Sequence, residues 1–65
     1  MPYVSSSAIS RIEYDAVSRQ LRITFRGSGT YTYYGVPQEV YERFLRASSK
    51  GSFYNDYIKD RYSRG

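Results

Sequence analysis

The chain has 65 residues and a formal net charge of +4 at pH 7, and it contains neither cysteine nor histidine. The missing residue types exclude disulfides, thiolate metal sites and the common nucleophile–base pairs of enzymes. A chain of this length forms one domain with a thin core, so its nine tyrosines must serve both that core and the surface.

The first predicted strand covers residues 8–14. Ile12 and Tyr14 share one face at the two-residue period of a strand, whereas Ile9 falls on the other face. This mismatch indicates a bulge near Ser10.

The second predicted strand, residues 19–26, is the clearest element of the chain. Apolar and polar residues alternate along it, which is typical of a strand with one face on a core and one face in water. Residues 27–29 form a glycine hairpin loop, and residues 30–34 form a third strand rich in β-formers. Because short loops join neighbours in space, we expect a three-stranded antiparallel meander. Its core face carries Leu21, Ile23 and Phe25.

The second half of the chain has helical spacing. Pro37 is expected in the first turn of a helix, and apolar residues at positions 40, 41, 44 and 45 continue its stripe. Gly51 is expected to end this helix as a left-handed cap, and Ser52 to cap a second, shorter helix. The ordered part is expected to end at Tyr62, with residues 64–65 as a frayed tail.

These elements predict an α+β domain of the order βββαα, with two short helices packed on one face of the meander. A single domain is expected to span residues 1–65, with an ordered core over residues 4–62. The first residues lack a basic leader and an apolar stretch, and no apolar run approaches the roughly 20 residues of a membrane helix. We therefore expect a soluble cytoplasmic protein without a membrane partner.

The carboxylates show no arrangement typical of a catalytic or metal site. Glu39 and Glu42 lie three residues apart, and Asp56 and Asp60 lie four apart, as on ordinary helix surfaces. The glycines on either side of Ser28 close a hairpin and are too weak as a nucleotide-binding motif. We therefore expect no enzyme, no cofactor, no metal and no small-molecule substrate.

Arginines beside an exposed ring, on the sheet face away from the core, have the composition of a single-strand nucleic-acid platform. The same residue types also make an ordinary solvated sheet face. A second basic group lies along the first helix and its end, where cations also favour the helix dipole. The candidate nucleic-acid-binding residues are Arg22, Arg26, Tyr34, Arg43, Arg46 and Lys50.

Residues 31–37, YTYYGVP, resemble the YxYxxVP signature of the KTSC domain, carried here by Tyr31, Tyr33, Val36 and Pro37. Further pieces in the same order extend the resemblance over about residues 4 to 62, including GSFYN at 51–55. The resemblance implies a small domain of the kind appended to some lysyl-tRNA synthetases and also found alone. Its biochemical role is not established, and RNA binding has been suggested from the synthetase context.

Tyr31 and Tyr33 share a face of the third strand. On the core face they are structural and pack against Val40 and Phe44, but a slip of one residue in the register turns them into open stacking rings. We favour the core for at least one of them, which leaves Tyr34 as the better stacking residue.

Two functions follow from different classes. An RNA-binding module predicts steep salt dependence of binding, because phosphate contacts release counterions. A module for protein interaction or self-association predicts a discrete stoichiometry and a patch of tyrosine and arginine. Both stay open at the level of the sequence.

Overall fold

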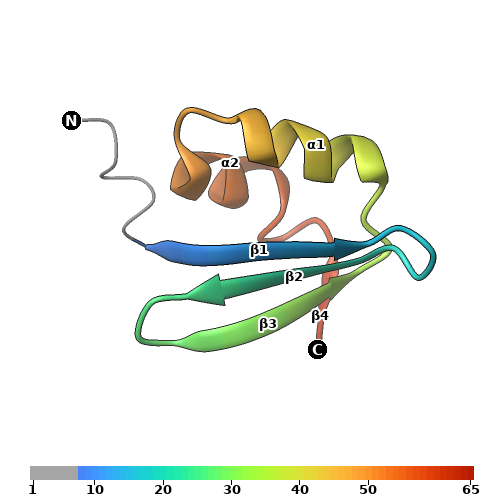
Figure 1. The fold of residues 1–65 in the computed structure, drawn as a ribbon, viewed down its shortest axis with the longest axis horizontal. Helices are drawn as coiled ribbons and strands as arrows, with labels where there is room; N and C mark the ends of the chain where they lie inside the picture. The colour runs from blue at the N-terminus through green and yellow to red at the C-terminus, as the bar shows by residue number, and fades with distance from the viewer. Residues whose placement is uncertain (1–7) are drawn as a thin grey trace.

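The computed structural model describes residues 8–65. Its elements are β1 (Ile9–Asp15), β2 (Gln20–Phe25), β3 (Gly29–Tyr34), α1 (Gln38–Arg46), α2 (Lys50–Tyr57) and β4 (Ser63–Arg64). The strands form one antiparallel sheet in the order β1-β2-β3-β4, and both helices lie over the same face of it (Figure 1). The predicted α+β class and βββαα order are confirmed, with β4 as an addition. Neither helix described here has the length and apolar character needed to cross a bilayer.

The strand register places the core where the alternation in β2 predicted it. Leu21 pairs with Tyr33 and Ile23 with Tyr31, so these four side chains share the face beneath the helices. Tyr33 is completely buried and Tyr31 is half-buried, which confirms the prediction that at least one of the signature tyrosines lies in the core. The buried core consists of Ile9, Leu21, Ile23, Tyr33, Val36, Phe44 and Ile58.

The predicted irregularity in the first strand is also present. The register of β1 against β2 shifts between Ile9 and Arg11, so an extra residue lies at Ser10 as expected. Beyond the shift, Ile12 and Tyr14 lie opposite Ile23 and Leu21 on the core face. The bulge therefore lets Ile9 and Ile12 reach the same core despite their odd spacing.

The end of the chain corrects one prediction. We expected the ordered part to end at Tyr62 and residues 64–65 to fray. Instead, Arg64 of β4 pairs with Tyr33 of β3, and the Gly65 N–H donates to the Thr32 carbonyl at 2.8 Å. The outer edge of β3 offers backbone groups that need partners, and this short segment supplies them. At the other end of the predicted core, residues 4–7 lie outside the described part of the chain.

The boundary between the helices also differs from the prediction. Ser49, not Ser52, caps α2, and its hydroxyl accepts from the Ser52 N–H at 3.3 Å. Gly51 therefore lies inside α2 instead of ending α1. Both serines are residue types that cap helices well. The Lys50 ammonium donates to the Ala47 carbonyl at 2.7 Å and so satisfies a backbone acceptor at the end of α1. Pro37 is the N-cap of α1, one residue before the predicted first turn.

Candidate nucleic-acid interface

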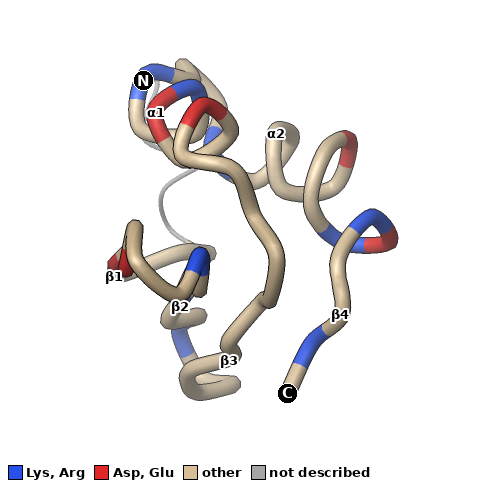
Figure 2. Tube along the Cα trace, turned by 90° about the vertical axis from the view of Figure 1, so that its right-hand side faces the viewer, with Lys and Arg blue, Asp and Glu red and all other residues tan. Residues whose placement is uncertain are grey.

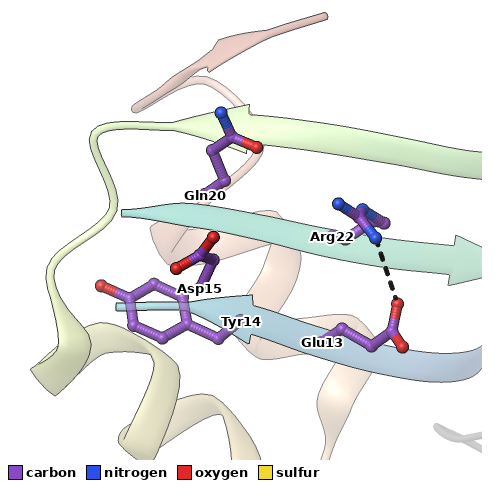
Figure 3. A pocket seen from close by; sticks show the side chains of 5 residues that line it. All are labelled: Glu13, Tyr14, Asp15, Gln20 and Arg22. Carbon is purple, nitrogen blue, oxygen red and sulfur yellow. Dashed lines mark ion pairs between the residues drawn. The ribbon is translucent and has the colours of Figure 1, made fainter. Parts of the chain in front are cut away.

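Arg22 lies on the open sheet face, as predicted, but not in basic surroundings. Its guanidinium is 3.6 Å from the Glu13 carboxylate, and Glu13 also holds Arg11 at 3.0 Å. Glu13 and Arg22 line a shallow pocket of about 270 Å³ together with Tyr14, Asp15 and Gln20 (Figure 3). Two carboxylates beside two arginines leave this part of the face close to neutral, which is a poor surface for phosphate.

Tyr34 also lies on the open face and is 43% exposed. It pairs with Ser63 of β4, and Gly65 packs so closely on its ring that a Cβ there would lie 2.7 Å from Tyr34 Cε2. The added strand therefore covers part of the ring that the sequence proposed for stacking.

The basic residues of α1 are paired with acids of the same helix. Arg43 lies 3.7 Å from Glu39, and Arg46 lies 3.8 Å from Glu42. Because α1 covers the core face of the sheet, these arginines belong to the helix layer, whereas Arg22 lies on the other face of the sheet, and basic segments occur in both layers (Figure 2). The structure therefore does not bring Arg43 and Arg46 onto the sheet face of Arg22, although Lys50 lines a hollow with Arg11 at the edge of β1.

A different surface combines rings with cations and has no carboxylate in its lining. We call it the aromatic groove, a hollow of about 380 Å³ on the helix side of the hairpin end of the sheet. It contains three cations and three half-buried rings, and no carboxylate lines it. Arg26 belongs here, in the turn after β2, and not beside Arg22 as the alternation suggested. The lining residues are Ala8, Phe25, Arg26, Ser28, Tyr31, Tyr54, Lys59 and Arg64.

The rings of the aromatic groove hold one another in place. Phe25 meets Tyr54 edge to face at 5.1 Å between centroids, and Tyr31 at 5.8 Å. The Tyr31 hydroxyl donates to the Ser28 carbonyl at 3.2 Å. The Arg64 guanidinium lies over the Tyr31 ring, 4.6 Å from its centroid. Rings and cation are thus positioned before any ligand arrives, which lowers the entropic cost of binding.

A second hollow adjoins the groove at the start of α2. It measures about 440 Å³ and shares Ala8, Phe25 and Tyr54 with the aromatic groove. Its remaining lining is mostly small and polar, from the first turns of α2 and the residue before it, where backbone N–H groups have no partner within the helix. These residues are Ser49, Gly51, Ser52 and Asn55, and Ile9 of β1 completes the lining.

Tyr54 links the groove to the core. Its hydroxyl lies 2.6 Å from the hydroxyl of the buried Tyr33. Burial, with the hydrogen bond to Tyr33 in addition, raises the pKa of Tyr54 to about 12. A hydrogen bond to Tyr33 likewise raises the pKa of Arg64 above its ordinary value, so the arginine stays charged.

We expect the free energy of unfolding to fall as the pH rises from 10.0, the ordinary pKa of tyrosine, towards about 12. The unfolded chain loses the Tyr54 proton first, so this contribution is complete below pH 10 and is lost as the pH reaches the raised pKa. Urea unfolding at about pH 9 and about pH 11.5 measures the fall. The fall in the free energy of unfolding should be smaller in Tyr54→Phe than in the natural chain. An equal fall in the variant and the natural chain would contradict this role of Tyr54.

The comparisons with known proteins agree with one another. The sequence matches the family model of the KTSC domain over residues 5–62. A protein of Tsukamurella paurometabola is 44% identical over 62 residues, which are 95% of this chain and 92% of the relative. A lysine–tRNA ligase of Nostoc punctiforme is 34% identical over 56 residues, 86% of this chain but 10% of the ligase. The crystal structure of a KTSC domain protein from Yersinia pestis matches with a TM-score of 0.91 and 45% identity, covering 95% of this chain and 87% of that one.

Proposed function

The chain belongs to the KTSC domain family, and on this premise we propose that it is a non-catalytic module that binds single-stranded RNA along the aromatic groove. The observation that carries the proposal is the lining of that groove. Three cations surround three rings, and no carboxylate lies among them.

Rings and cations have separate tasks in this proposal. A base stacked on an aromatic side chain contributes about 1–3 kcal/mol, largely independent of its identity. Tyr31 and Phe25 offer ring surface at the hairpin end, while Arg26 and Lys59 extend as exposed cations beside them. Such a site holds a few nucleotides with little sequence preference.

The class of nucleic acid is supported by the family. The Nostoc punctiforme relative is by its name a lysine–tRNA ligase, and the matching segment is a small part of it. A small domain attached to an enzyme that acts on tRNA favours RNA over other polyanions as the ligand.

An NMR titration of labelled protein with a mixed-sequence single-stranded RNA tests the proposal. We expect shifts at Phe25, Arg26, Tyr31 and Lys59. Three phosphate contacts on a single strand give a slope of about −2 in a plot of log affinity against log salt concentration. Inorganic polyphosphate is the control, because it carries the charge of RNA without the bases. It should shift the NMR signals of the cationic residues more than those of the aromatic residues.

Two results would count against the proposal. Spectra that do not change at a large excess of RNA exclude binding to this ligand. Shifts confined to Arg43 and Arg46 would place the binding surface on α1, outside the aromatic groove.

A further inference from the structure

β1 is the first strand of the sheet and has a partner on one side only. It is seven residues long and pairs with β2, and no other strand within residues 8–65 takes its outer edge. Such an edge presents a row of backbone N–H and C=O groups that can pair with another strand. On the helix side, the Tyr14 ring stacks on Tyr41 at 4.8 Å and its hydroxyl donates to the Val36 carbonyl at 2.6 Å, so the edge is held rigidly.

The charges along this edge are self-complementary. Arg11 and Glu13 lie on the open face on either side of Ile12. If a second copy pairs antiparallel with its two-fold axis at Ile12, Arg11 of each copy lies directly opposite Glu13 of the other. A two-fold axis through a residue pair is compatible with antiparallel pairing whether or not that pair is hydrogen-bonded.

The existing ion pairs extend this arrangement. Glu13 already lies between Arg11 and Arg22 of its own chain. In the paired edge, each Glu13 gains a third arginine from the second copy, and acid and base alternate across both sheets. Opposite charges directly across two strands stabilise the pairing, and like charges destabilise it.

The helix side of the same edge is partly apolar and incompletely covered. Leu45 of α1 is 45% exposed, and it lines a hollow of about 230 Å³ with Ile9 and Ile12. Ser10, Arg11 and Lys50 complete the lining, so the apolar contact is confined to the part around Ile12 and Leu45. In the paired arrangement the two Ile12 side chains become neighbours, and Leu45 of each copy approaches the same seam. Both faces of the edge therefore suit a second copy of this chain.

We infer that β1 is a self-association edge, through which two chains join antiparallel about Ile12 into one continuous sheet with four strands from each copy. The regular part of the contact runs from Arg11 to Glu13, beyond the bulge, so the dimer is reversible and weak. The edge carries no cation of the aromatic groove, and Arg64 lies at the opposite edge of the sheet, so the inference is independent of RNA binding.

Sedimentation velocity over about 10 µM to about 1 mM protein tests the inference, together with Arg11→Glu and Glu13→Lys. Each variant alone places like charges opposite each other at both contacts, and we expect dimerisation to weaken about tenfold or more. An equimolar mixture of the two variants restores both opposite-charge contacts and should form a heterodimer as well as the natural chain dimerises. Arg61→Glu, at an exposed residue before β4, is the matched control and should leave dimerisation unchanged.

Three outcomes would overturn the inference. The natural chain remains monomeric up to about 1 mM; or both variants dimerise as strongly as it does, so that another surface is used; or the mixture shows no recovery. Circular dichroism of each variant establishes that a loss of dimer is not a loss of fold.

Discussion

Phe44→Ala is expected to lower the free energy of unfolding by about 3–5 kcal/mol. Phe44 is completely buried and stacks on Phe53 of α2 at 5.4 Å between ring centroids. It is the buried residue of α1, so its removal leaves a cavity where this helix meets the sheet. Small domains have total stabilities near the lower end of about 5–15 kcal/mol, so a large fraction of the variant will be unfolded.

Urea unfolding followed by circular dichroism measures this loss, with Leu45→Ala as the control. Leu45 is the next residue of the same helix and is 45% exposed. At a protein concentration low enough to keep the chain monomeric, Leu45→Ala should lower the free energy of unfolding by less than about 1 kcal/mol. Equal losses in the two variants would mean that α1 does not use Phe44 as its main contact with the core.

The strand pattern of the sequence predicted the faces of the sheet well because one face is buried. The alternation around Leu21 and Ile23 admits only one register, since a slip of one residue would expose both. That register also places Tyr33 in the core. By contrast, β4 has two residues and no periodicity, so no local pattern distinguishes it from a frayed tail.

The candidate site was only partly predictable, for a related reason. Arg26 and Tyr31 were noted in the sequence, but in separate roles. Phe25 was assigned to the core face and Arg64 to the frayed tail, and neither Tyr54 nor Lys59 was given a role in binding. The aromatic groove brings these residues together from the hairpin, from α2 and from β4. No spacing in the sequence carries that information, because it depends on how the chain returns to the edge of β3 after α2.

The same limit applies to charge. The sequence offered Arg22, Arg43 and Arg46 as candidate binding residues, yet each has a carboxylate within 4 Å in the structure. Exposed ion pairs contribute little to stability, but they lower the potential that attracts phosphate. The cations of the proposed RNA site are therefore Arg26, Lys59 and Arg64, which have no carboxylate among the lining of their groove.

The combined variant Arg26→Gln, Lys59→Gln and Arg64→Gln is therefore expected to weaken RNA binding by about ten- to hundredfold, if each exposed ionic contact contributes up to about 1 kcal/mol. Loss of three phosphate contacts should also flatten the salt dependence by about 2 in the log–log slope. Fluorescence anisotropy with a labelled single-stranded RNA at several salt concentrations measures both effects.

The matched control is Arg22→Gln, Arg43→Gln and Arg46→Gln, which removes the same net charge from residues that are paired with acids. If binding depends on the groove, this control keeps most of the affinity and most of the salt slope. If binding depends only on net charge, the two variants weaken equally, and the aromatic groove is then not the RNA site. The variant Tyr31→Ala tests base stacking separately from charge. It should weaken RNA binding by about 1–3 kcal/mol, the contribution of one stacked base, and leave the salt slope unchanged.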